Sequence, residues 1–431
     1  MERYDLYKDS GVEWIGEIPS SWGKTKLKYK LQEVVTGGTP DTSNDSFWSD
    51  EDKGINWISI SDITSNGREI SGTKKFISEK GLKSKKLKIL PIGSLIYSIY
   101  GSIGKISRLG IPSTVHQGIL GLRTNSTYNT TFLEYYLIYF KEYVSLFSSS
   151  NTQENLNQEK VSNFDIPVPP LSEQQQIVSF LDTKTSLIDS LIEKTQRKIE
   201  LLKEKRTSLI NEVVTKGLNP NVEMKDSDVE WIGEIPSHWD TPFFGLISNL
   251  QQGLQIPFDN RFFEKEEGMF EYITTKSVHN PNDPRQYVLN PKKSVVCGKD
   301  EILYGRTGNT GEVITNVEGV FHNNFFKIVY DKDKLVKEYL IYQLTNSRFR
   351  ETILLLSGTT TIPDLNHGDF NSMRCLIPPV KEQQQIVEFL DEQTGLIDKT
   401  ISIEEKRIEL LKEYRQSLIS EVVTGKRKVV E

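Results

Sequence analysis

The 431-residue sequence has few of the residues that build covalent or metal-centred frameworks. It contains two cysteines and five histidines, which leave no room for a disulfide framework or a cysteine zinc site. No run of about 18 apolar residues predicts a membrane span, and the polar start MERYDLYKDS does not fit a signal peptide. We therefore expect a cytosolic protein. The net charge of −6 argues by itself against a nucleic-acid binder, but a local basic patch decides such binding.

The glycine-rich segments lack the full pattern of a nucleotide site. Gly101–Lys105 (GSIGK) is followed by Ile106, where a phosphate-binding loop requires serine or threonine. Gly305, Gly308 and Gly311 have no βαβ context with a downstream acid, as a dinucleotide fold requires. We interpret both segments as turns between strands.

Catalytic signatures are also missing. Asp41 with Glu51 and Lys53 matches a loose nuclease pattern, but it lies in a polar loop and has no counterpart in the second half, so we treat it as chance. The tetrapeptide of amino-methyltransferases, Asn or Asp followed by Pro-Pro and an aromatic residue, does not occur. A stand-alone nuclease therefore stays the weakest of the functions considered.

One unit is written twice in the chain. Glu173–Thr215 returns as Glu382–Thr424, 209 residues later and without a gap, with 28 of 43 positions identical. Asp9–Trp22 (DSGVEWIGEIPSSW) returns as Asp226–Trp239, with 12 of 14 identical. Two copies of a long period indicate an internal duplication and not a solenoid.

The first repeated segment predicts a long helix of the coiled-coil type. We expect it to be capped by Ser172 and ended by Gly217, and about 43 residues give about 65 Å of helix. Its seam, spaced alternately three and four, is Val178, Leu181, Thr185, Ile188, Ile192, Thr195, Ile199, Leu202, Arg206, Leu209 and Val213. The second copy repeats this seam from Val387 to Val422.

The two variable stretches, residues 23–165 and 240–375, differ in detail but have related patterns. Strand-like runs such as residues 55–63 and 270–278, separated by turns, precede an apolar helix-like segment in each (residues 131–147 and 335–346), which predicts mixed α/β domains. We align His116 with His322, and the segment ending in Leu156-Asn157 with that ending in Leu365-Asn366. We also align Tyr100-Gly101 with Tyr304-Gly305. A common scaffold with two surfaces fits a protein that reads two targets.

Basic and amide side chains near these turns are the candidate DNA-binding residues. Residues 72–89 contain seven lysines and one glutamate, which alone could be a solvated face. Lysines attract phosphates, whereas Arg, Asn, Gln and His read base edges. In the first half the candidates are Lys74, Lys75, Lys83, Lys85, Lys86, Tyr100, Ser102, Lys105, Arg108, His116, Gln117, Asn151, Thr152 and Gln153. In the second half they are Lys276, His279, Arg285, Lys292, Lys293, Arg306, Asn309, His322, Asn323, Thr359 and Thr360.

The repeated motifs carry a family resemblance. WIGEIP at Trp14–Pro19 and Trp231–Pro236, the helix openings IPVPPLSEQQQIV and IPPVKEQQQIV, and the ends SLINEVVTKG and SLISEVVTGK resemble the specificity subunit of type I restriction-modification systems. The resemblance covers essentially the whole chain, and the combination of motifs is specific although each one alone is weak.

This resemblance implies a mixed α/β (α+β) fold with two target-recognition domains, two long antiparallel coiled-coil helices and a pseudo-twofold repeat. The expected segments are residues 1–165 (first recognition domain), 166–217 (central helix), 218–375 (second recognition domain) and 376–431 (C-terminal helix). Each recognition domain is expected to read one half of a bipartite double-stranded DNA site, and the helices to set the spacer.

The resemblance also implies partners. Two methyltransferase (modification) subunits that methylate adenine and restriction motor-nuclease subunits are expected to bind this chain. The chain itself is expected to hold no catalytic residue, metal or cofactor, because S-adenosylmethionine, ATP and Mg²⁺ belong to those partners. The alternative is a coiled-coil scaffold that binds only protein; it accounts for the acidic charge and the helices, but not for two divergent basic and glycine-rich heads.

Overall fold

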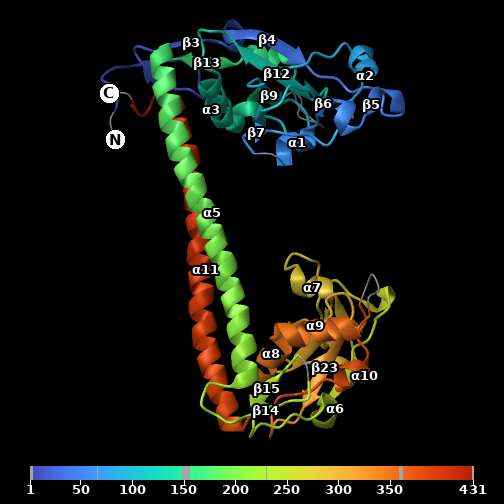
Figure 1. The fold of residues 1–431 in the computed structure, drawn as a ribbon. Coiled ribbons are helices and arrows are strands. Elements are labelled where there is room, and N and C mark those ends of the chain that lie inside the picture. Colours follow the sequence, from blue (N-terminus) through green and yellow to red (C-terminus); the bar gives the residue numbers. More distant parts are fainter. Residues whose placement is uncertain (1–2, 66, 148–155, 230, 359–362, 430–431) are drawn as a thin grey trace. The chain divides into compact units, whose positions relative to one another are not determined.

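The computed structural model describes residues 3–65, 67–147, 156–229, 231–358 and 363–429. Contacts divide the chain into two compact units, residues 1–195 with 406–431 (unit 1) and residues 196–405 (unit 2). Two long helices, α5 (Leu171–Lys216) and α11 (Val380–Val423), contribute one segment each to both units. Each unit therefore combines a variable stretch with part of both repeated helices (Figure 1).

Unit 1 is built around a five-stranded sheet. Its order is β4 (Leu31–Thr36), β12 (Ile119–Thr124), β9 (Leu95–Ser98), β10 (Ile106–Leu109) and β7 (Glu69–Ile70). Only the β10–β7 pairing is parallel. A smaller four-stranded sheet has the order β11 (Thr114–Val115), β6 (Ile55–Ile58), β8 (Phe76–Ile77) and β5 (Trp48–Ser49). The remaining helices are α1 (Ile60–Ser65), α2 (Glu79–Ser84), α3 (Thr130–Phe140) and α4 (Gln158–Ser162).

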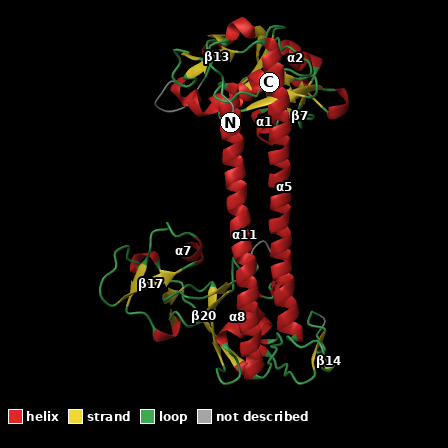
Figure 2. Ribbon diagram, turned by 90° about the vertical axis from the view of Figure 1, so that its left-hand side faces the viewer, coloured by secondary structure: helices red, strands yellow, loops and turns green. Residues whose placement is uncertain are grey.

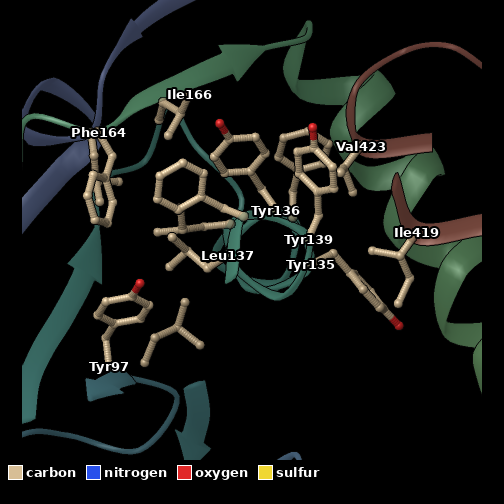
Figure 3. Close-up of a cluster of buried hydrophobic side chains, with 14 of the residues drawn as sticks. Tyr97, Tyr135, Tyr136, Leu137, Tyr139, Phe164, Ile166, Ile419 and Val423 are labelled. Carbon is tan, nitrogen blue, oxygen red and sulfur yellow. The ribbon is translucent and has the colours of Figure 1, made fainter. Parts of the chain in front are cut away.

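The central strands of this sheet are buried on both faces. Successive side chains point to opposite sides of a strand, so alternate residues of β9 join two different cores. Leu95 and Tyr97 join the core formed with α3, whereas Ile96 between them joins a second core with Ile58 of the smaller sheet. Figure 3 shows the first core, where α3 presents rings such as Tyr136 between neighbouring segments of unit 1.

Unit 2 repeats this plan with different residues. One sheet has the order β16 (Ser248–Gln252), β23 (Phe325–Tyr330), β20 (Ile302–Gly305) and β21 (Val313–Ile314). The other has the order β18 (Tyr287–Leu289), β17 (Met269–Ile273), β22 (Gly319–Phe321) and β19 (Val296–Cys297). The helices are α6 (Phe244–Ile247), α7 (Thr275–His279), α8 (Lys337–Thr345), α9 (Ser347–Leu356) and α10 (His367–Asn371).

Within each unit α5 and α11 lie side by side and antiparallel (Figure 2). In unit 2, Lys198 pairs with Glu404 at 2.6 Å and Arg206 with Asp398 at 3.0 Å, so higher α5 numbers face lower α11 numbers. In unit 1, Arg415 pairs with Asp189 at 2.9 Å, which is the Arg206–Asp398 pair repeated 209 residues away. The predicted seam is confirmed, since its apolar members are buried or half-buried.

The two tryptophan motifs hold the ends of the long helices. Trp22 is fully buried in the unit 1 core, together with Leu418 and Val422 of α11. Trp239 is likewise buried in unit 2 with Val213 near the end of α5, and its indole N–H donates to Glu382 of α11 at 3.2 Å. This shared role explains why the motif is repeated while the residues after it are not.

Several sequence-based expectations need correction. Helix α5 begins at Leu171, so Ser172 lies inside the first turn and is not its cap. The helix-like run ending at Phe147 is α-helical only to Phe140 and continues as a 3-10 helix. The second parts of two strand-like runs, 55–63 and 270–278, are helical (α1 and α7), because the pairing of β6 with β11 ends at Ile58 and that of β17 with β22 ends at Ile273.

The predicted alignment of Tyr100 with Tyr304 is wrong. Tyr97 and Tyr304 occupy equivalent places in β9 and β20, opposite Leu120 and Phe326 of the neighbouring strands. The hydroxyl of each tyrosine lies 3.6 Å from the position that a Cβ would take on Gly104 and Gly311, respectively. The residue pattern was misleading because Tyr97 is followed by serine, and the Tyr-Gly pair of the first half stands three residues after it.

Candidate functional site

His116 is fixed in the turn between β11 and β12. Its backbone N–H donates to Ile58 O at 2.9 Å, and its Nδ1 accepts the N–H of Gly118 at 2.9 Å. Because Nδ1 is an acceptor, the proton of the neutral ring resides on Nε2. The turn therefore holds a half-buried imidazole in one orientation with a defined donor.

An aromatic side chain supports this imidazole. The Trp57 ring lies 5.5 Å from the His116 ring, edge to face, and its indole N–H donates to Gly38 O at 2.9 Å. The Lys75 ammonium lies 5.7 Å from the centre of the Trp57 ring, within cation–π range, and 5.9 Å from that of Trp48. A cation is thus held beside the histidine.

A glycine closes the same turn in each unit. A Cβ on Gly37 would lie 2.1 Å from His116 O, and one on Gly253 would lie 2.2 Å from His322 O. Any larger residue would displace the backbone that carries the histidine. This close approach explains a glycine directly after β4 and directly after β16.

Unit 2 repeats the site around His322. Its backbone N–H donates to Ile273 O at 2.9 Å, and its Nδ1 accepts the N–H of Asn324 at 3.1 Å. Tyr272 takes the place of Trp57: its ring lies 5.8 Å from His322 and its hydroxyl donates to Leu254 O at 3.0 Å. Arg261 lies 5.0 Å from the centre of the Tyr272 ring, where Lys75 stands in unit 1.

These two groups are called the histidine sites: Gly37, Trp57, Lys75 and His116 in unit 1, and Gly253, Tyr272, Arg261 and His322 in unit 2. Burial lowers the pKa of both imidazoles, and the nearby cation, Lys75 or Arg261, lowers it further. Both rings are therefore neutral at physiological pH and keep a single N–H donor.

The structure brings together part of the predicted set in unit 1. Tyr100 and Gln117 adjoin His116: Tyr100 Cβ lies 3.2 Å from the position that a Cβ on Gly118 would take, and Gln117 is exposed. The predicted lysines of this unit before and after α2 are all exposed: Lys74, Lys75, Lys83, Lys85 and Lys86. Ser102 is half-buried in the β9–β10 turn.

Two other predicted residues of unit 1 lie apart from the histidine site. Lys105 lines a separate hollow with Arg68 and Arg415. The Arg108 guanidinium donates to Glu134, a carboxylate with no exposed surface, and to Thr131 at 2.9 Å. In this conformation Arg108 serves the packing of α3 and is not available to a ligand.

In unit 2 some of the predicted residues gather around His279, apart from the histidine site. His279 donates its Nδ1–H to Thr275 O at 2.7 Å, its Nε2 lies 2.7 Å from a carboxylate oxygen of Glu312, and the Asn309 amide approaches Nε2 at 3.1 Å. Hydrogen bonds to Thr275 and Glu312 raise the pKa of His279. Lys292 and Lys293 are exposed, and Asn323 is half-buried beside His322.

Three further predicted cations of unit 2 are paired with carboxylates: Arg285, Lys276 and Arg306. Arg285 pairs with Glu271 at 3.1 Å and donates to Ser277 O at 2.7 Å, and Lys276 pairs with Asp283 at 2.9 Å. Arg306 pairs with Asp364 at 2.9 Å and donates to Leu365 O at 3.0 Å. The remaining predicted residues lie outside the described residues: Asn151, Thr152, Gln153, Thr359 and Thr360.

Within the described residues, no three His, Cys, Asp or Glu side chains gather closely enough to hold a metal ion. Asp41 of the loose nuclease pattern is used in a turn, where it accepts hydrogen bonds from the N–H and hydroxyl of Ser43.

No helix of the described ranges is both long and apolar enough to cross a membrane. The glycines at 101, 104, 308 and 311 have positive φ, as expected for turns.

Sequence reasoning missed Trp57, Tyr272 and Arg261. The aromatic residue is Trp in one unit and Tyr in the other, and the two cations come from different loops, so no pattern of letters repeats. One signal was present: each aromatic residue directly precedes an isoleucine that pairs with the histidine backbone, Ile58 or Ile273. Aligning strand ends instead of residue types could have found them.

Known proteins resemble this chain along most of its length. A family model described as "Type I restriction modification DNA specificity domain" matches residues 20–201 and again residues 236–413. The type I restriction enzyme MjaIX specificity subunit of Methanocaldococcus jannaschii is 26% identical over 429 residues, which cover 97% of this chain and 96% of that protein. The EcoR124I/EcoR124II specificity subunit of Escherichia coli is 28% identical over 205 residues, or 45% of this chain and 46% of that protein.

Solved structures share the fold. One, from work on complex assembly and conformational transition of the type I R-M system, has a TM-score of 0.75 at 17% identity, and covers 94% of this chain and 98% of its own. The HsdS subunit from Thermoanaerobacter tengcongensis has a TM-score of 0.57 at 16% identity, with 95% and 98% covered. At these identities the likeness concerns the fold alone.

Proposed function

This chain belongs to the type I restriction-modification DNA specificity family and recognises a DNA target through two domains, and from that premise we propose how it does so. Each unit reads one half of a bipartite double-stranded DNA site. The helices α5 and α11 set the unread spacer and bind two methyltransferase subunits, which restriction motor-nuclease subunits then join. S-adenosylmethionine, ATP and Mg²⁺ act in those partners, and the assembly works in the cytoplasm.

The observation that carries the two-reader proposal is the pair of histidine sites. Both keep the same backbone hydrogen bonds and the same imidazole tautomer. The aromatic and cationic neighbours differ, Trp57 with Lys75 in one and Tyr272 with Arg261 in the other. A constant framework with changed side chains supports two surfaces that read different sequences with one geometry.

Exposed apolar side chains on the long helices support the docking proposal. They occupy the c and g positions of the heptad, beside the seam. In an antiparallel pair the g positions of both helices lie on the same side, so these side chains border one face of the pair. They are between 41% and 59% exposed: Leu187, Leu191, Leu410 and Tyr414 in unit 1, and Leu201, Leu396 and Ile403 in unit 2. We call them the c/g stripe, and helices of a partner subunit would bury it.

A domain exchange tests the two-reader proposal. Residues 240–375 would be replaced by the corresponding stretch of a relative, and the reconstituted complex with its methyltransferase subunits would methylate a DNA library read by single-molecule sequencing. One half-site should change while the other and the spacer stay. A change in both halves, or in neither, would contradict the proposal.

The scaffold alternative has one observation in its favour, the c/g stripe, which is suited to protein partners. DNA binding by the reconstituted complex across a salt series separates the two functions. Phosphate contacts release counterions, so DNA recognition predicts an affinity that falls steeply between about 50 and 200 mM salt. A scaffold would give no salt-dependent DNA binding.

A further inference from the structure

The Nε2 atoms of His116 and His322 are donors held in place and unused inside the protein. Nδ1 of each ring is occupied by a backbone N–H, at 2.9 Å in unit 1 and 3.1 Å in unit 2. Within the residues that the structure describes, Nε2 of neither imidazole has a hydrogen-bond partner. Neither Nε2 is among the buried atoms that lack a partner, so both donors are open to solvent and accessible to a ligand.

The ring around each donor is fixed from several sides. The glycine at the preceding strand end, Gly37 or Gly253, packs directly on the histidine carbonyl, and the aromatic neighbour is itself tied to a backbone carbonyl. The ring therefore does not need to be ordered on binding, which reduces the entropy lost when a ligand engages it. Such fixed donors are suited to discrimination.

We propose that His116 and His322 are specificity-determining residues, each donating its Nε2–H to an acceptor on a base edge in the major groove of its own half-site. This rests on the proposed function, that each unit reads one half-site. The acceptors that fit are N7 or O6 of guanine, N7 of adenine and O4 of thymine. Cytosine presents an amino donor at this edge and is rejected, because two donors would face each other.

The cations beside the two rings differ in their internal contacts. Lys75 is exposed and its ammonium lies 5.7 Å from the centre of the Trp57 ring, so it can contact a phosphate and set the register in which the imidazole meets a base. Arg261 lies 5.0 Å from the centre of the Tyr272 ring and donates to Ile256 O at 2.8 Å and to Gln286 at 3.3 Å, so the fold holds it in place.

The test uses the complex reconstituted with methyltransferase subunits. His322→Asn keeps the turn, because an asparagine oxygen accepts the N–H two residues on, but it withdraws the donor from the position of Nε2. His322→Phe keeps the ring shape without any donor. Both variants and the wild type would methylate a randomised bipartite DNA library, with single-molecule sequencing as the readout.

We expect both variants to relax one base position in the half-site read by unit 2, with about a tenfold loss of preference there, and to leave the other half-site unchanged. His116→Asn should do the reverse. His367→Asn, the same substitution in α10 of unit 2, is the matched control and should change no position.

Unchanged preference in His322→Asn and His322→Phe, with wild-type melting temperatures, would overturn the proposal. So would an equal loss in both half-sites, because it would indicate a general positioning effect. Failure of the proposed function itself is distinguishable: the wild-type complex would then show no bipartite methylation pattern.

Discussion

At the residue scale, the surroundings of three histidines shift their pKa in opposite directions. Burial and a neighbouring cation lower the pKa of His116 and His322, whereas hydrogen bonds to Thr275 and Glu312 raise that of His279. In a histidine-labelled NMR titration we expect the first two to titrate below the ordinary value of about 6.5, and His279 above it. His279→Asn would assign the high signal, and a common midpoint for all three would contradict this account.

The sign of the stability effect follows from these shifts. Because the folded pKa of His116 and His322 is lowered, the unfolded chain takes up their protons first, and stability is lost as pH falls below about 6.5. His279 acts in the opposite direction: its contribution is present at low pH and is lost as pH rises through its raised pKa. The unfolding midpoint of His116→Asn should therefore rise relative to that of the wild type as pH falls below about 6.5.

Glu134 is the buried charge on which the α3 face of unit 1 depends. It has no exposed surface and accepts from both Arg68 and Arg108. Glu134→Ala leaves Arg108 without a carboxylate partner, while Arg68 keeps Asp182 at 2.6 Å, and we expect it to destabilise the protein by about 3 kcal/mol in urea unfolding. Glu33→Ala removes a partly exposed carboxylate that pairs with Lys88 at 2.7 Å and Arg123 at 3.4 Å and is the control, expected to change stability little. Equal effects of both would contradict a special role for burial.

Residue types alone predicted part of the site. The correspondence of His116 with His322 was found because histidines are rare in this chain and each follows a strand. The arginines were assigned to DNA because arginine commonly reads bases, yet Arg108, Arg285 and Arg306 have carboxylate partners in the fold. A side chain's internal partners depend on distant residues, which a local pattern does not show.

At the element scale, the long helices were the most predictable feature. A seam sustained over many turns specifies a helix whatever it packs against, so the repeated segments 173–215 and 382–424 begin and end within two residues of α5 and α11, although the expected segments 166–217 and 376–431 were wider. The short strands were less predictable, because α1 and α7 interrupt apolar runs that read as continuous strands. There the tertiary pairing with β11 and β22, and not local propensity, decides where the strand ends.

The c/g stripe can be tested on the helices themselves. Leu187→Lys exchanges an exposed apolar contact for a charge without touching the seam, so binding of the methyltransferase subunit should weaken about tenfold to a hundredfold, the equivalent of about 1.5–3 kcal/mol. Calorimetric titration of the purified subunits would measure it. Ser186→Lys, at the adjacent exposed position outside the stripe, is the matched control. Equal affinities for the two variants would show that partners do not bind this face.

At the scale of the whole molecule, the duplication repeats some contacts of one unit in the other. The Asp189–Arg415 pair in unit 1 and the Arg206–Asp398 pair in unit 2 are the same two positions of the repeat. Glu173 accepts from Tyr4 in unit 1, and its repeat Glu382 accepts from Trp239 in unit 2. Two equivalent surfaces support binding of two equivalent partners, and the conservation between repeats lies in the helices and tryptophan motifs, not in the reading heads.

The spacer proposal can be tested by shortening both long helices in register. Residues 196–202 of α5 and 402–408 of α11 face each other, because Lys198 pairs with Glu404. Deleting these two heptads keeps the seam in phase and shortens the helices by about 10 Å. We expect the methylated site to keep both half-site sequences and to lose about three base pairs of spacer, since base pairs are about 3.4 Å apart along a strand.

Deleting only four residues from α5 provides the contrast for this experiment. Four residues are not a whole heptad, so the seam after the deletion no longer faces α11, and we expect lower thermal stability together with weakened methylation. The in-register deletion should instead melt as one cooperative species and methylate a shorter site. If that variant methylates sites with the original spacer, the helices do not set the spacing, and the separation of the half-sites must be fixed by the partner subunits.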